Sequence, residues 1–212
     1  MKRKSKILGF MIMIIASLGY ICTDYIVIQS NEKAIEYTKQ AENFFREALT
    51  VIDTTIKYQK YAEALDKLNK ALECDSNYFP AYYLKINIFE EMRNYNKAFM
   101  ITKQLELKKG KYPELLTIQG MLLEKLNKSK ESKEKFNVAL LLYTKKIEKS
   151  KTPLFNDKIN VIYLQLFLNG KEVALEKLDK LKDLFPDRLD DIEYHRVVIE
   201  NFNWNKYFHN SL

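Results

Sequence analysis

The chain has 212 residues, a formal net charge of +7, 5 glycines, 4 prolines and 2 cysteines. Two cysteines cannot make the disulfide framework of a small secreted domain, and the scarcity of Gly and Pro favours helices over a turn-rich β-fold. Residues 1–6 carry four of the positive charges, and residues 7–22 carry none, so the rest of the chain has only 7 − 4 = +3. Lys and Glu are interleaved along it, which indicates solvated helix faces and no nucleic-acid partner.

Residues 1–28 are predicted to be a signal peptide or a transmembrane anchor. A basic head, residues 1–6, precedes the uncharged apolar stretch 7–22, which is typical of export signals. Basic residues stay in the cytoplasm, so we expect the rest of the chain to be membrane-anchored and extracytoplasmic. A retained transmembrane helix is favoured because apolar character resumes towards the end of the segment. Cleavage after Gly19, which would give a secreted or periplasmic protein, and lipidation at Cys22 are the alternatives.

Residues 29–44 are expected to form the N-terminal part of a long first helix. This helix should run from about Asn31 to Lys57, because no Pro or Gly interrupts the span.

A repeat follows. Ala64, Ala98 and Ser132 are small residues spaced thirty-four apart in similar local sequence. Seven residues beyond each of them comes a second small or apolar residue: Ala71, Leu105 and Ala139. A period of this length indicates one helical hairpin copied several times, each copy burying its apolar face against its neighbours.

The repeated text resembles the tetratricopeptide repeat, a helix–turn–helix unit of thirty-four residues. Gly120 matches the family's small first-helix residue, and Tyr82 matches its aromatic residue. A fourth copy begins after eight added residues, which we place between Lys145 and Pro153, where a second helix overruns. The resemblance implies an all-α, right-handed α-solenoid of four repeats over residues 45–187. Their boundaries are 45–78, 79–112, 113–153 and 154–187, with helix pairs turning near Lys60, Asn94, Lys128 and Gly170.

Residues 188–212 are predicted to be a capping helix and an aromatic tail. A solenoid needs a terminal helix to close its last apolar face. We expect Phe202, Trp204, Tyr207 and Phe208 to fold back over that helix, the alternative being a partner-binding tail.

No catalytic, cofactor-binding or metal site is predicted, so the sequence does not indicate an enzyme. His195 and His209 are the only histidines, and neither has a Cys or a second His at ligand spacing. The acidic cluster at 187–193 follows Pro186 and suits the start of a helix. A glycine-rich phosphate loop is absent from the sequence.

The resemblance also implies a binding groove, because first helices of successive tetratricopeptide repeats line a concave surface. Apolar anchors together with Asn amides suit an extended peptide or an amphipathic helix. The alternative is that several of these residues contact neighbouring helices. The candidate groove residues are Leu49, Asp53, Tyr83, Leu84, Asn87, Thr117, Ile118, Met121, Ile159, Asn160 and Tyr163.

The sequence therefore predicts a non-catalytic protein–protein interaction scaffold or adaptor, membrane-anchored or exported, whose partner is a protein or peptide. The short basic signal and the abundance of Lys, Asn, Ile and Tyr are typical of a bacterial protein. The alternatives are a structural assembly factor of an envelope complex and an accessory subunit of an enzyme.

Overall fold

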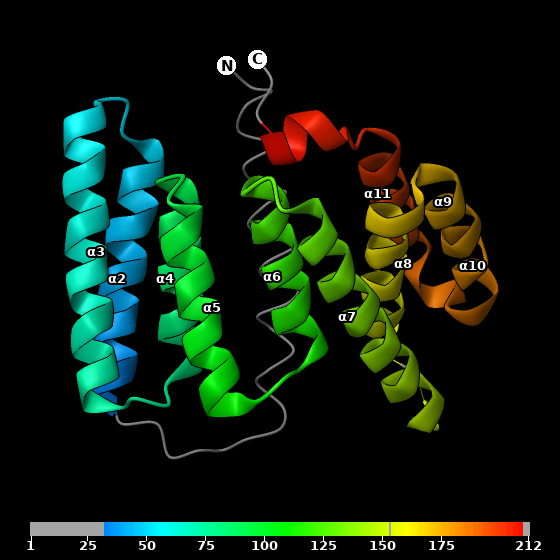
Figure 1. Cartoon of the computed structure of the whole chain (residues 1–212), viewed down its shortest axis with the longest axis horizontal. Coiled ribbons are helices and arrows are strands. Elements are labelled where there is room, and N and C mark those ends of the chain that lie inside the picture. Colours follow the sequence, from blue (N-terminus) through cyan, green and yellow to red (C-terminus); the bar gives the residue numbers. More distant parts are fainter. Residues whose placement is uncertain (1–31, 153, 210–212) are drawn as a thin grey trace. The chain divides into compact units, whose positions relative to one another are not determined.

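The computed structural model describes residues 32–152 and 154–209. These residues form ten α-helices with short turns and no strand, which confirms the all-α prediction (Figure 1). The predicted signal or anchor over 1–28 lies outside the described residues. Among the described helices, none is long and apolar enough to cross a membrane. The chain divides into two compact units, one ending at Gly110 and the other beginning at Lys111.

The part of the first unit that the structure describes, residues 32–110, contains four helices that pack as sequence-adjacent pairs, α2 with α3 and α4 with α5 (Figure 1). Such pairing is consistent with an α-solenoid. The four helices are α2 (Glu32–Thr50), α3 (Thr54–Cys74), α4 (Phe79–Glu91) and α5 (Tyr95–Lys109).

The long first helix predicted from Asn31 to Lys57 is wrong, because residues 51–53 are not helical and separate α2 from α3. The Asp53 carboxylate accepts a hydrogen bond from the Ile56 backbone N–H at 3.0 Å and so caps α3. An Asp at this position satisfies an otherwise unpaired N–H and favours a helix start. The turn predicted near Lys60 is wrong for the same reason, since Lys60 lies inside α3.

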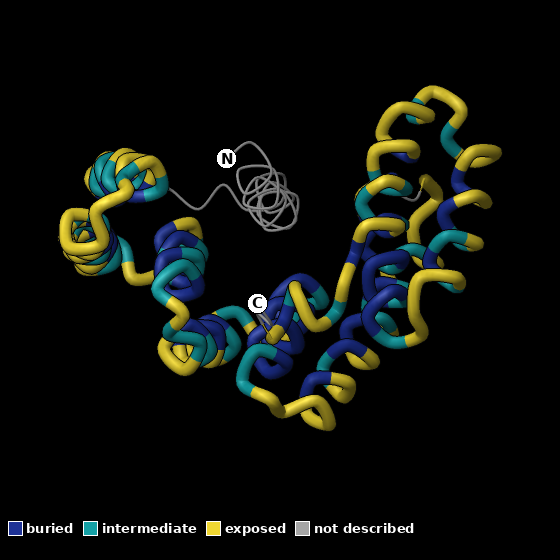
Figure 2. Tube along the Cα trace, turned by 90° about the horizontal axis from the view of Figure 1, so that it is seen from above, coloured by how far each residue is buried: buried dark blue, intermediate teal, exposed yellow. Residues whose placement is uncertain are grey.

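Small residues hold the helix pairs of the first unit close together. Ala41 and Ala48 on α2 and Ala64 and Ala71 on α3 are all fully buried. Small side chains let two helix backbones approach closely. In both units the buried positions follow the helix sides that face other helices, and exposed positions follow the loops and outer sides (Figure 2).

The second unit also packs sequence-adjacent helices, α6 with α7 and then α8 with α9. Its main helices are α6 (Pro113–Lys125), α7 (Ser129–Lys149), α8 (Phe155–Asn169) and α9 (Lys171–Asp179). The C-terminal elements are α10 (Leu181–Leu184), a 3-10 turn η2 (Pro186–Arg188), α11 (Leu189–Glu200) and a π-helical turn η3 (Asn205–His209).

Three of the four predicted turns are confirmed. Asn94 caps α5 by accepting a hydrogen bond from the Lys97 N–H at 3.2 Å. The α6–α7 turn ends at Lys128, and Gly170 joins α8 to α9 with φ at 91°, a value that favours glycine. The overrun predicted after Lys145 is also confirmed, since α7 continues to Lys149.

Gly120 allows α6 and α7 to touch. A Cβ atom at this position would lie only 2.4 Å from Cε1 of Phe136. The Phe136 side chain is fully buried and packs against Phe167 of α8, with ring centroids 5.2 Å apart. One aromatic ring therefore joins three helices of the second unit.

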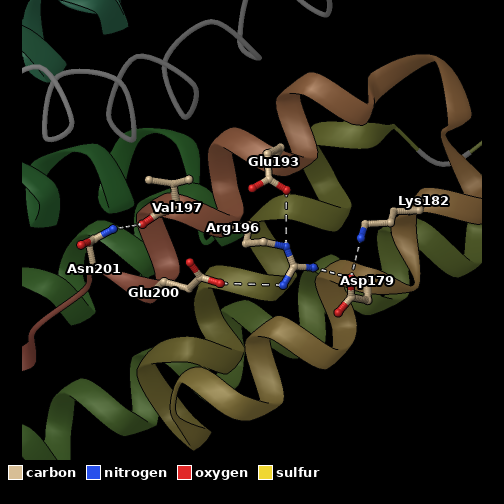
Figure 3. A network of polar contacts seen from close by, with 7 residues as sticks. All are labelled: Asp179, Lys182, Glu193, Arg196, Val197, Glu200 and Asn201. Carbon is tan, nitrogen blue, oxygen red and sulfur yellow. Dashed lines mark hydrogen bonds and ion pairs between the residues drawn. The ribbon is translucent and has the colours of Figure 1, made fainter.

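A polar network fixes α11 against α9 (Figure 3). The Arg196 guanidinium of α11 bonds to the Asp179 carboxylate of α9 and lies 3.6 Å from a Glu193 carboxylate oxygen. The Lys182 ammonium, 2.9 Å from Asp179, and Arg196 together hold the pKa of the Asp179 carboxyl below its ordinary value. On its inner side α11 buries Ile192.

Candidate binding surface

In the first unit, the predicted groove residues divide into core and partly exposed positions. Leu49 and Leu84 belong to the apolar cluster of α2, α3 and α4. Asp53 caps α3 from an exposed turn, so its carboxylate has a local structural role. Tyr83 and Asn87 are only partly buried and lie four residues apart on α4, which places them on one helix face.

The Asn87 side-chain carbonyl is buried and accepts no hydrogen bond from the described residues. A buried acceptor without a donor costs about 1–3 kcal/mol. On α4 the neighbouring Lys85 is better satisfied, because its ammonium donates to the Asn69 side-chain oxygen of α3 at 2.8 Å. Burial lowers the pKa of Lys85. Buried side-chain oxygens without a hydrogen-bond partner among the described residues also occur at Thr38, Tyr61 and Ser132. Of these groups, Asn87 is the one that lies on the predicted groove.

In the second unit, the predicted groove residues on α6 are buried. Ile118 is 4% exposed and Met121 is 2% exposed. The Thr117 hydroxyl donates to the Pro113 carbonyl at 2.9 Å, so its hydrogen bond closes within its own helix. All three side chains therefore belong to the interior of the second unit.

The predicted residues on α8 are buried as well, and their polar groups are paired. The Asn160 amide donates to the Tyr143 hydroxyl of α7 at 3.0 Å. The Tyr163 hydroxyl lies 2.9 Å from His195 Nδ1 on α11. Ile159 is 4% exposed. The structure therefore brings these residues together with α7 and α11 partners that the sequence did not indicate.

His195 sits in an aromatic pocket made by Phe155, Tyr163 and Tyr194. Burial lowers the pKa of His195 to about 4, with Arg188 adding to the effect and Asp191 opposing it. The imidazole is therefore neutral at pH 7, and its Nδ1 shares a hydrogen bond with the Tyr163 hydroxyl, in which Nδ1 is the acceptor when the imidazole carries its hydrogen on Nε2. Burial also raises the pKa of Tyr163 above its ordinary value, so this pair is a neutral hydrogen bond.

Lys146 joins the starts of two helices. Its ammonium lies 2.8 Å from the Asp157 carboxylate in the first turn of α8 and 3.9 Å from the Glu114 carboxylate in the first turn of α6. Both carboxylates are nearly buried, and each suits the positive end of its helix dipole. This group was not predicted from the sequence. Its signal there was an acidic residue at the start of each of two helices and a lysine near the end of the helix between them.

The C-terminal segment, residues 201–209, packs on the same two helices. The π-helical turn η3 lies against α6, and the Lys125 ammonium of α6 lies 5.7 Å from the Tyr207 ring centroid. The Phe167 ring of α8 lies 5.8 Å from the rings of Phe202 and Phe208. The aromatic tail therefore folds back onto its own unit, but the contacts described are with α6 and α8 and not with the capping helix over which the sequence predicts it to fold.

Neither unit gathers a metal-binding set: over residues 32–152 and 154–209, no group of three or more His, Cys, Asp or Glu side chains could hold a metal ion. The contacts described above are packing and hydrogen-bonding contacts within each unit. Comparisons with models of known families, with curated proteins and with solved structures found no match.

Proposed function

We propose that the chain is a non-catalytic protein–protein interaction scaffold or adaptor that binds a peptide or a helix of a partner protein. In this proposal the helix pairs form a right-handed solenoid of tetratricopeptide type, and first helices such as α4 contact the partner. Sequence-adjacent pairing supports it, as do the fully buried small residues Ala64, Ala98 and Ser132 at the thirty-four-residue period. Helical repeat arrays of this kind present extended binding surfaces.

The proposal also includes a membrane anchor or export signal over residues 1–28, which would place the helical units outside the cytoplasm. The basic head and the apolar stretch in the sequence support it. Retention of the full-length protein in carbonate-washed membranes would support an anchor. Release of the protein, or an N-terminus mapped to Tyr20, would contradict it.

The observation that carries the proposed function is the partly exposed face of α4 that bears Tyr83 and Asn87. Partner binding would turn the Asn87 side-chain carbonyl, which is buried and has no hydrogen-bond partner among the described residues, towards the partner. An extended peptide offers backbone N–H groups along its length, and an Asn side chain on a groove can accept from one of them. Tyr83, one turn away on the same face of α4, would supply an aromatic contact beside that hydrogen bond. A polar acceptor beside an aromatic group is suited to a peptide ligand.

A crosslinking pull-down from membranes, followed by affinity measurement with the captured partner, tests the proposal. Asn87→Ala should weaken partner binding by about 1–2 kcal/mol, or roughly 5–30-fold. The matched control is Asn96→Ala, because Asn96 is an exposed residue on α5. Tyr83→Ala should also weaken binding, and Tyr58→Ala, at a half-exposed tyrosine of α3, is its control.

The effect of Asn87→Ala on the free protein separates a binding role from a structural one. Because the carbonyl has no donor among the described residues, its removal should leave the free energy of unfolding unchanged within about 0.5 kcal/mol or should raise it. A clear loss of stability would mean that Asn87 holds the fold together. Unchanged partner binding in both Asn87→Ala and Tyr83→Ala would refute a binding surface on α4.

A further inference from the structure

Residues 201–209 cover the carboxyl-terminal ends of α6 and α8. Lys125, which contacts Tyr207, is the last residue of α6, and Phe167, which contacts the aromatic tail, lies in the last turn of α8. Phe208 is 2% exposed and Phe202 is 8% exposed. In Figure 1 this turn, coloured red, lies across the end of α6. The tail is therefore a packed part of the second unit.

The two contacted residues continue the faces on which peptide binding was predicted. On α8, Phe167 follows Tyr163 by four residues, so the two side chains share a face. On α6, Lys125 follows Met121 by the same interval. Met121 and Tyr163 are themselves buried, so the tail extends the covering of these two faces to the carboxyl-terminal ends of α6 and α8.

Side chains, rather than a helix ladder, attach the tail. The Tyr207 N–H donates to the Asn203 carbonyl, and the Lys206 N–H donates to the Asn203 side chain, both at 2.9 Å and both within the tail. The tail's regular structure is a single turn of the rare π-helix. Because residues 202–209 follow α11, their departure from α6 and α8 would leave the α-helices they cover intact.

We propose that residues 202–208 act as a built-in peptide ligand that closes the surface at the ends of α6 and α8, and that a partner segment bearing aromatic side chains competes with it. The inference rests on the proposed function. Phe167, which contacts Phe202, Trp204 and Phe208, would stack with aromatic side chains of the incoming segment in the same way. A tethered ligand has an effective concentration of about 1 mM, so a segment whose own Kd is about 100 μM would be bound roughly ten times out of eleven.

Trp204 gives a direct measurement of closure, because it is the only tryptophan of the chain. In the full-length protein, its emission should be that of a packed indole. The double variant Phe202→Ala/Phe208→Ala should shift the emission to longer wavelength while the helical circular dichroism is kept. The matched control is Leu184→Ala/Leu189→Ala, which changes two exposed apolar residues near α11 and should leave the emission unchanged.

The competition itself is measured with a fluorescein-labelled peptide of residues 201–209. Its binding to the full-length double variant, followed by anisotropy, should be at least about tenfold tighter than its binding to the wild type, because the tethered competitor has been weakened. Tyr207→Ala removes a half-buried ring that packs on Phe208 with centroids 4.7 Å apart. It should give an intermediate Kd, and it serves as the second variant if the double variant loses its helices.

Four results would overturn the inference. The peptide could bind wild type and open variants equally, or bind neither, which would mean that the tail is not a ligand. Alternatively, wild type could form a concentration-dependent dimer with Trp204 still packed, which would mean that the tails exchange between copies. A captured partner that requires Asn87 but is insensitive to the state of the tail would overturn this inference and leave the proposed function intact.

Discussion

Replacing Gly120 by Ala tests how closely α6 and α7 touch. The added methyl would lie 2.4 Å from Cε1 and 2.6 Å from Cδ1 of Phe136, far inside the optimal carbon–carbon separation of about 3.5–4.0 Å. The Phe136 ring is fully buried and rests against Phe167. It therefore has little space into which it can withdraw.

Two opposing effects set the size of the change. An alanine is favoured over a glycine inside a helix by about 1 kcal/mol. Overpacking a filled core costs about 1–3 kcal/mol, with the larger values where the neighbour cannot move. Because the clash at Gly120 falls on a ring held between helices, we expect overpacking to win, with a net loss of about 1–2 kcal/mol in the free energy of unfolding.

Urea unfolding followed by circular dichroism measures this loss. A double-mutant cycle with Phe136→Leu supplies the control, since the smaller side chain leaves room for the methyl and should reduce the cost of Gly120→Ala. If Gly120→Ala instead stabilised the wild-type background by about 1 kcal/mol, helix propensity alone would be acting. The close approach of α6 to α7 would then be refuted.

Three further changes test other contacts. His195 is protonated near pH 6.5 in the unfolded state and only near pH 4 in the folded state, so its contribution to the free energy of unfolding should be complete above about pH 6.5 and should fall by about 2–3 kcal/mol as the pH drops to 4. Urea unfolding across this range should show a steeper loss of stability with falling pH in wild type than in His195→Gln. Parallel curves for the two proteins would contradict the burial of His195. Asp53→Ala should cost about 1 kcal/mol by removing the cap of α3, measured as a lower thermal midpoint, with Asp53→Asn as the conservative control. Lys146→Met should cost about 2 kcal/mol, because the nearly buried Asp157 carboxylate loses a charged hydrogen bond, and rescue by Asp157→Asn in a double-mutant cycle is the check.

Local sequence patterns were sufficient to predict the helix pairs. Ala64, Ala98 and Ser132 are fully buried, as their small size and regular spacing indicate, because close helix crossings within one hairpin depend on residues near in sequence. The break between α2 and α3 was missed. There the helix-forming tendency of the surrounding residues competed with one capping carboxylate, that of Asp53, and the cap determined where α3 begins.

The candidate site was harder to predict because its polar contacts join distant residues. Asn160 and Tyr143 are seventeen residues apart, and Tyr163 and His195 are thirty-two apart. No local pattern states which helix will cover a given face, so side chains assigned to a partner proved to be paired inside the second unit. On α4 the prediction was closer, since Asn87 keeps a carbonyl without a donor among the described residues.

Pairing between neighbours in sequence also has a kinetic consequence. Because α2 packs on α3, and α6 on α7, a hairpin can form as soon as its second helix has been synthesised, without waiting for residues near the end of the chain. Structures built from local contacts have low contact order and fold in microseconds to milliseconds. Synthesis proceeds at about 5–20 residues per second, so each hairpin would be assembled well before the next one emerges. The growing chain would then expose mainly the apolar face of its latest hairpin, which the next hairpin covers.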